Sequence, residues 1–120
     1  MEYNLKQYAH IGDAVWELFV REQVIKVAQN QKTMHKMTTD KVRAEFQAET
    51  LEKLGEFLTE DEQDIARRGR NLSLTINKRN NPAIHRQATA FEVLTGYWYL
   101  NDKQRLNEIL DIIKEKSLWR

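Results

Sequence analysis

The chain has 120 residues, of which 41% are hydrophobic and 31% charged, enough for one core but not for a second module. It contains no cysteine, which excludes disulfides and thiolate metal sites. No run of the sequence resembles a signal segment or a membrane span, so we expect a cytoplasmic protein with no membrane partner. Four glycines and one proline favour an all-α domain, and we expect a single domain over residues 1–120.

The first predicted helix, over residues 4–28, is expected to be the central and most buried one. At helical spacing, one apolar face is formed by Leu5, Tyr8, Gly12, Val15, Trp16 and Phe19. Asp13 lies roughly a quarter turn from the centre of this face, at the rim of the predicted core. Glycine inside a helix costs about 1 kcal/mol relative to alanine, and close approach of a second helix would explain Gly12.

The middle of the chain is more polar. The stretch over residues 30–36 predicts a connection that leads into a helix ending near residue 57. Residues 59–62 read Thr-Glu-Asp-Glu, a capping-box pattern that predicts a short helix over residues 60–69. For residues 71–81 the alternation allows a short strand, but the asparagine cluster and the following Pro82 favour a loop.

Charge is distributed unevenly, although the formal net charge is only +1. Residues 45–64 contain eight acids and one lysine, whereas residues 65–91 contain no acid. The bases of this second segment are Arg67, Arg68, Arg70, Lys78, Arg79 and Arg86. Arginines at a helix end commonly do no more than compensate the helix dipole, but the acid-free segment around them favours contact with phosphate.

A second helix combines a glycine with an acid. Pro82 at a first-turn position predicts a helix from there to about residue 100. Its apolar face comprises Ala88, Phe91, Thr95 and Trp98, with Glu92 at the edge and Gly96 one turn further on. We expect this helix to pair with the first one. A final amphipathic helix, with an apolar face of Leu106, Ile109, Leu110 and Ile113, is expected to cover the core.

Three separated motifs occur together in this chain. They are Ile11-Gly12-Asp13-Ala14-Val15 with Glu17, then Arg68-Gly69-Arg70-Asn71, then Thr89-Ala90-Phe91-Glu92 with Gly96-Tyr97. In this order they resemble Mini-ribonuclease III, a family of bacterial ribonuclease III-type enzymes that lack a double-stranded-RNA-binding domain. The resemblance extends from about residue 5 to the final helix. It implies an all-α ribonuclease III-like endonuclease domain that acts as a homodimer.

The resemblance also implies the chemistry of the site, with Asp13 and Glu92 as catalytic residues and metal ligands. Magnesium binds oxygen ligands and keeps several waters, so two carboxylates and a substrate phosphate can hold it, and manganese is a plausible substitute. Full-length ribonuclease III enzymes carry two further acids, at positions that are Ala9 and Thr89 here. Without the resemblance, each carboxylate reads as an exposed helix residue or half of a salt bridge.

The family further implies a substrate and partners. The expected reaction is cleavage of double-stranded RNA to 5′-phosphate and 3′-hydroxyl ends in the maturation of 23S ribosomal RNA precursor, with a ribosomal protein of the large subunit as a further partner. The expected RNA-binding residues are His35, Lys36, Arg67, Arg68, Arg70, Asn71, Lys78, Arg79 and Arg86. Part of the aromatic surface of the helices is expected to lie between subunits, and the residues that form this surface are Trp16, Phe91, Trp98 and Tyr99.

Two other interpretations stay open at the level of sequence. A catalytically silent version of the same fold would bind RNA during ribosome assembly without cutting it. A helical protein-interaction module would use no nucleic acid, and the histidine and lysine at positions 35 and 36 would then be solvated surface residues.

Overall fold

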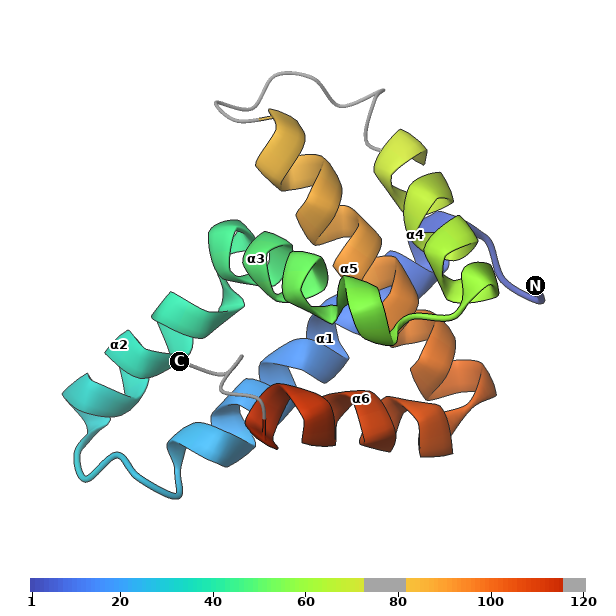
Figure 1. Cartoon of the computed structure of the whole chain (residues 1–120). Helices are drawn as coiled ribbons and strands as arrows, with labels where there is room; N and C mark the ends of the chain where they lie inside the picture. Colours follow the sequence, from blue (N-terminus) through green and yellow to red (C-terminus); the bar gives the residue numbers. More distant parts are fainter. Residues whose placement is uncertain (73–81, 116–120) are drawn as a thin grey trace.

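The computed structural model describes residues 1–72 and 82–115, and all regular secondary structure in this part of the chain is helical (Figure 1). The elements are α1 (Leu5–Val24), α2 (Gln31–Val42), α3 (Ala44–Leu54), the short 3-10 helix η1 (Gly55–Phe57), α4 (Glu60–Leu72), α5 (Pro82–Asn101) and α6 (Lys103–Glu115). The prediction of an all-α domain is confirmed. Most of the predicted loop, including Lys78 and Arg79, lies outside the described residues. None of the described helices is long and apolar enough to span a bilayer.

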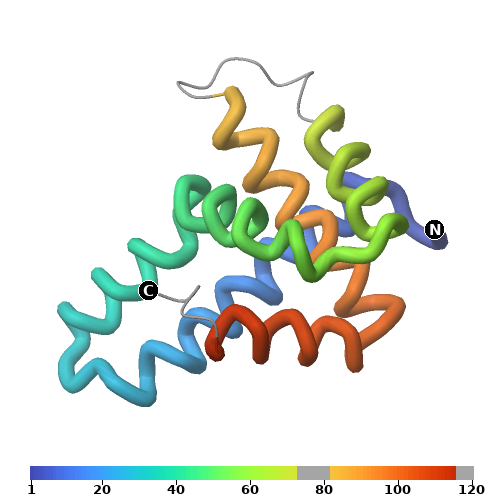
Figure 2. The backbone as a smooth tube through the Cα atoms, viewed as in Figure 1, coloured from blue at the N-terminus to red at the C-terminus, as the bar shows by residue number. Residues whose placement is uncertain are grey.

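Helix α5 lies at the centre of the fold. It packs against α1, α3, α4 and α6, and the tube in Figure 2 shows it crossing α1 with α3 and α4 beside it. Eight of its 20 residues are buried, compared with six of the 20 residues of α1. The expectation that the first helix would be the most buried is therefore wrong. Helical periodicity shows which face of a helix is apolar, but not how many neighbours the helix has. Helix α5 is apolar around more of its circumference, and neighbouring helices cover it on several sides.

Helices α1 and α5 approach each other closely at two glycines. A Cβ atom added to Gly12 would lie 1.8 Å from the carbonyl oxygen of Glu92, and one added to Gly96 would lie 1.9 Å from the carbonyl oxygen of Tyr8. Real side chains do not make contacts this short, so only glycine fits at either position. The expected pairing of the two glycine-containing helices is confirmed.

The prediction of a connection at residues 30–36 is wrong. Residues 31–36 form the first half of α2, which begins after Asn30, whose side-chain oxygen accepts a hydrogen bond of 2.9 Å from the backbone N–H of Thr33. The single helix expected to end near residue 57 is in fact two helices separated by Arg43, which is extended at φ −69° and ψ 158°. Helix α2 buries none of its residues, so it lacks the apolar periodicity by which helices are recognised.

The predicted capping box at the start of α4 is confirmed, and its glutamate has a second role. The Glu62 carboxylate accepts hydrogen bonds from the backbone N–H of Thr59 at 2.9 Å, from Nε1 of Trp98 at 2.9 Å and from Nε of Arg105 at 2.8 Å. Burial alone would raise the pKa of Glu62, but these hydrogen bonds together lower it below its usual value. The ion pair with Arg105 ties α4 to α6, and the hydrogen bond from Trp98 ties α4 to α5.

The close approach of α1 and α5 makes a testable prediction. We expect Gly12→Ala to lower the free energy of unfolding by about 3 kcal/mol or more, because the added methyl group would push the two backbones apart. Gly55→Ala is the matched control, because Gly55 has helical φ and ψ and open space around its Cβ position. It should be neutral or stabilise by about 0.5–1 kcal/mol. Urea unfolding measures both, and equal effects would contradict the prediction.

Candidate active site

The contact between α1 and α5 brings the two predicted carboxylates together. Gly12 packs against the backbone of Glu92, so the next side chain of α1, Asp13, reaches the Glu92 side chain and shares a hydrogen bond with it. Asp13 is exposed, whereas Glu92 is partly buried between the helices. Two residues that are 79 positions apart in the sequence thus form one acidic pair at the surface of the central helix pair.

This pair is electrostatically strained. Burial, the negative charge of Asp13 and the hydrogen bond shared with Asp13 raise the pKa of Glu92 from 4.5 to about 8, and a hydrogen bond from Gln47 offsets part of this rise. The pair therefore retains a proton near neutral pH. A divalent cation between the carboxylates would relieve the repulsion and displace that proton.

An aromatic cluster fixes the helices beneath the carboxylates. The ring of Trp16 meets that of Phe91 edge-on at a centroid distance of 5.0 Å and stacks on Phe46 at 6.3 Å. Nε1 of Trp16 donates to the carbonyl oxygen of Lys41 at 2.9 Å, which ties α1 to the end of α2. Because Phe91 precedes Glu92 and Trp16 follows Asp13 by one turn, this packing holds both acids.

The expectation that part of this aromatic surface lies between subunits can apply to only one of the four residues. Trp16, Phe91 and Trp98 are at most 1% exposed within a single chain, so they belong to its core. Tyr99 is 38% exposed and remains on the surface. Large aromatic residues on a helix face pack first against other helices of the same chain, and the sequence does not show how much of that face remains exposed.

Gln47 of α3 is a site residue that the sequence reasoning missed. Its side chain is almost completely buried, its Nε2 donates to the carbonyl oxygen of Val42 at 2.8 Å, and it reaches Glu92 closely enough to offset part of the rise in the pKa of that carboxyl. The pattern did contain a signal, because Gln47 lies on the buried face of α3, at helical spacing from Leu51 and Leu54. A polar residue in the middle of such a face usually has a specific partner.

The donor set at this site suits a hard cation. Asp13, Glu92 and the Gln47 amide offer only oxygen acceptors, which magnesium and manganese prefer. Within residues 1–72 and 82–115, no three His, Asp or Glu side chains form a metal-binding group. Ala9 and Thr89 are partly buried and cannot supply a carboxylate. A cation at this site would therefore have two carboxylates as protein ligands, and water and substrate oxygens would complete its shell.

Comparison with known proteins decides the family of this fold and site. A model of the ribonuclease III domain matches residues 6–103. Mini-ribonuclease 3 of Gloeobacter violaceus is 44% identical over 112 residues, which cover 93% of this chain and 83% of that protein. Mini-ribonuclease 3 of Thermosynechococcus vestitus is 44% identical over 105 residues, 88% of this chain and 70% of that protein. The chain belongs to the Mini-ribonuclease III family.

The fold agrees with this assignment. The crystal structure of a Fusobacterium nucleatum protein superimposes with a TM-score of 0.82 at 27% sequence identity, covering 97% of this chain and 95% of that one. The resemblance seen in the three motifs is therefore confirmed, and the chain is a ribonuclease III-type endoribonuclease. A helical interaction module without nucleic acid is excluded as its class.

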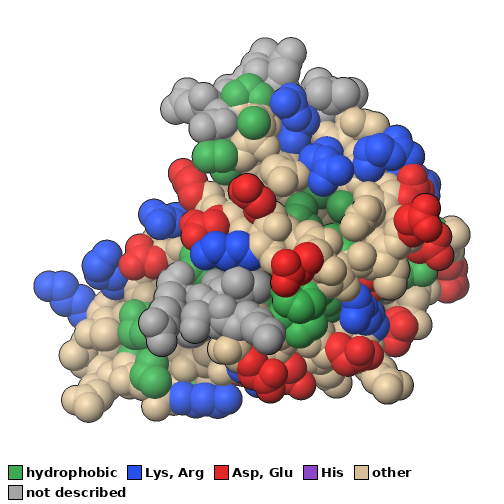
Figure 3. Space-filling view, viewed as in Figure 1, with side chains coloured by type: hydrophobic (Ala, Val, Ile, Leu, Met, Phe, Trp, Pro, Cys, Tyr) green, Lys and Arg blue, Asp and Glu red, His purple; other side chains and the backbone are tan. Residues whose placement is uncertain are grey.

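Most of the described basic candidates lie at one end of the molecule. Arg67, Arg68 and Asn71 are exposed near the end of α4, and Arg70 donates to Oε1 of Gln87 at 3.1 Å on α5. Arg86 lies six residues before Glu92, or about 9 Å along the helix axis. Lys and Arg side chains accordingly gather at the upper end of the molecule in Figure 3, over α4 and α5.

The remaining candidates lie elsewhere or are already paired. His35 and Lys36 are exposed on α2, on the other side of α5 from α4 in Figure 1, and Lys36 pairs with Asp40 at 3.4 Å. Arg67 pairs with Asp64 on its own helix. Such exposed pairs contribute little to stability, so these cations can exchange partners for a phosphate.

The raised pKa of Glu92 predicts an unusual dependence of stability on pH. Between pH 4.5 and about 8 the folded state holds a proton that the unfolded state has lost, so stability should fall as pH rises through this range. Glu92→Gln removes this dependence. Without divalent cations, the variant should melt several degrees above wild type near pH 8 but close to it near pH 5. A change of about 1 kcal/mol in the free energy of unfolding shifts the melting temperature by about 4 °C.

The control for this experiment is Glu56→Gln, which changes an exposed glutamate of η1. Its melting temperature should follow that of wild type at both pH values. If Glu92→Gln melted below wild type near pH 8, the carboxyl pair would be a stabilising contact and the prediction would be wrong.

Proposed function

We propose that this chain is a magnesium-dependent endoribonuclease that cuts double-stranded RNA and leaves 5′-phosphate and 3′-hydroxyl ends. The observation that supports this most directly is the contact between Asp13 and Glu92 on paired helices, below a basic end of the same molecule. Manganese is proposed as a substitute for magnesium. The activity is assigned to a single ribonuclease III-like catalytic domain spanning residues 1–120.

Asp13 and Glu92 act as the catalytic residues by holding the cation. A bound divalent cation supplies an activated water and offsets the negative charge that develops on the scissile phosphate. The exposed Asp13 side chain lies where a phosphate can approach, while the partly buried Glu92 is held by the packing of α5. Neither carboxylate is a nucleophile in this scheme, because water attacks the phosphate in line.

The RNA duplex is held mainly through its backbone. The proposed contacts are His35, Lys36, Arg67, Arg68, Arg70, Asn71, Lys78, Arg79 and Arg86. A-form RNA presents phosphates and 2′-hydroxyls across a wide, shallow minor groove, so recognition depends on shape and sequence preference is modest. The arginines of α4 provide charge near the carboxylate pair, and α2 extends the contact along the duplex.

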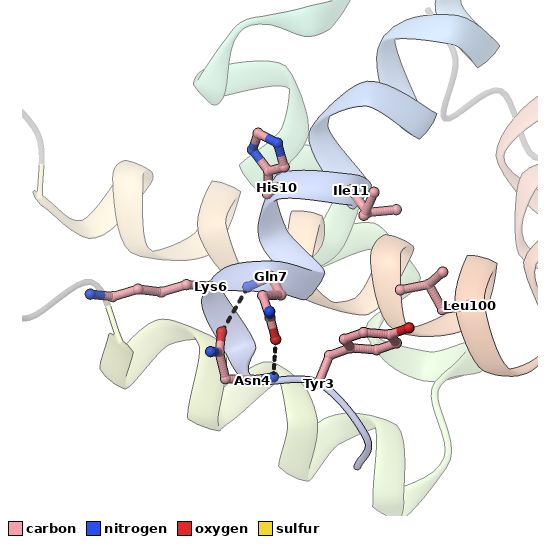
Figure 4. A pocket seen from close by; sticks show the side chains of 7 residues that line it. All are labelled: Tyr3, Asn4, Lys6, Gln7, His10, Ile11 and Leu100. Carbon is pink, nitrogen blue, oxygen red and sulfur yellow. Dashed lines mark hydrogen bonds between the residues drawn. The ribbon is translucent and has the colours of Figure 1, made fainter.

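A homodimer would supply one carboxylate pair for each RNA strand. The outer face of α1 supports this proposal, since Leu18 and the C-cap residue Ile25 are seven residues apart, on one face, and 60% and 67% exposed. Next to this face Tyr3, Ile11 and Leu100 surround a hollow of about 560 Å³ (Figure 4). A second copy that buried these apolar groups would leave the carboxylates accessible. Sedimentation at micromolar concentration tests for the dimer.

The biological setting is proposed from the family alone. We propose 23S ribosomal RNA precursor as the substrate, a cytoplasmic location and a ribosomal protein of the large subunit as a further partner. The alternative is a catalytically silent member that binds RNA in ribosome assembly. The paired carboxylates favour the interpretation as an enzyme, because their repulsion is unfavourable unless a bound cation offsets it, and a protein that only binds RNA needs no such cation.

The decisive test compares Asp13→Asn and Glu92→Gln with wild type on an RNA duplex. Both substitutions keep the side-chain size and remove one anionic ligand. We expect each to bind RNA normally but to cleave it more than about 100-fold more slowly, since even groups that only support a metal ligand contribute about 10–100-fold. Gel analysis of end-labelled duplex measures cleavage, and filter binding measures affinity.

Glu56→Gln is the matched control and should cleave like wild type. Chelation of magnesium should arrest wild type in the same way as the two substitutions. Cleavage by Asp13→Asn at the wild-type rate would refute the assigned chemistry. Wild type that binds duplex but cuts with neither magnesium nor manganese would favour the silent alternative.

The basic end makes a separate prediction. If Arg68 contacts a phosphate, Arg68→Ala should reduce the slope of log affinity against log salt concentration by about 1, because one fewer counterion is released on binding. Lys114→Ala removes an exposed base on α6 and should leave the slope unchanged. An equal slope for all three proteins would show that Arg68 is not part of the RNA contact.

A further inference from the structure

Gln47 is anchored in one orientation. Its side chain is 2% exposed, and the 2.8 Å hydrogen bond from Nε2 to the carbonyl oxygen of Val42 fixes which end of the amide is the nitrogen. A rotated amide would place oxygen against oxygen at this contact. The amide nitrogen also has a second hydrogen, and the contact with Glu92 can use it, so one group joins α2, α3 and α5.

The other end of the same amide has no partner. Among the described residues, Oε1 of Gln47 is the only buried side-chain nitrogen or oxygen without a hydrogen bond. Leaving a buried acceptor unsatisfied costs about 1–3 kcal/mol, and an apolar side chain of similar volume would avoid that cost. A buried amide that reaches Glu92 and leaves its oxygen unpaired therefore indicates that Oε1 is used when the site is occupied.

We propose that Gln47 is a positioning residue of the cation site. Its N–H groups hold the Glu92 carboxylate in the orientation that ligates the cation, and Oε1 accepts a hydrogen bond from ordered water in the occupied site. This inference rests on the proposed function and adds a residue to it. Hydrogen bonds around metal-binding carboxylates commonly set ligand orientation and metal affinity, and magnesium sites retain several waters.

A purely structural role is the competing explanation. The bond to Val42 closes the break between α2 and α3, and loss of that bond alone would lower stability without affecting the cation. Thr50 offers a matched comparison. It lies one turn further along α3, is 1% exposed, and its Oγ1 donates to the carbonyl oxygen of Phe46 at 2.8 Å.

The experiment measures cation affinity in the absence of RNA. Manganese is titrated into wild type, Gln47→Met and Thr50→Val, and free manganese is followed by electron paramagnetic resonance, with magnesium as competitor. Gln47→Met keeps the length of the side chain and removes both polar atoms. We expect it to weaken manganese binding about 10–100-fold, and Thr50→Val to bind like wild type. RNA binding in the presence of chelator should be unchanged in both variants.

The outcomes separate this inference from the proposed function. If Gln47→Met binds manganese like wild type while Asp13→Asn does not, Gln47 has only a structural role and the site assignment stands. If Thr50→Val and Gln47→Met weaken binding equally, the effect comes from general loosening of α3 and the inference is overturned. If wild type shows no binding that depends on Asp13, both proposals fail. Gln47→Leu replaces Gln47→Met if the latter does not fold.

Discussion

The structure depends on the contact between the backbones of α1 and α5 at Gly12 and Gly96. At these two positions a methyl group would collide with a carbonyl oxygen of the opposite helix, so the helices can be this close only because both residues lack a side chain. The other elements pack around this pair, with α3, α4 and α6 on α5 and α2 on α1. A separation larger by the width of one methyl group would also move the two carboxylates apart.

The same contact brings two acidic side chains together. Asp13 lies against Glu92, and burial together with the repulsion from Asp13 raises the pKa of Glu92 to about 8. Nearby, Gln47 leaves a buried oxygen unsatisfied. Both features oppose stability in the free protein, and the aromatic cluster of Trp16, Phe91 and Phe46 beneath them offsets this. Local conflicts of this kind within an otherwise consistent core are typical of functional sites.

Charge and apolar surface are divided between different elements of a small domain. The end of α4 and the start of α5 carry exposed or partly exposed arginines, whereas the outer face of α1 exposes Leu18 and Ile25. Helix α1 therefore contributes one face to the core and the acid site, and its other face is the one that we propose to meet a second copy. In the proposed function, this division lets one helical domain place catalysis, RNA contact and self-association on different surfaces.

The sequence by itself determined the features that are encoded locally. Helical periodicity, the capping box at Thr59 and Glu62, and the glycine beside each acid depend on neighbouring residues, so the helices, their pairing and the candidate acids could be predicted. The tertiary structure decided what depends on distant neighbours. It split the second predicted helix at Arg43, buried Trp16 and Phe91 within one chain, and brought Gln47 to Glu92. These outcomes follow from packing between segments far apart in the chain, which spacing along the sequence does not encode.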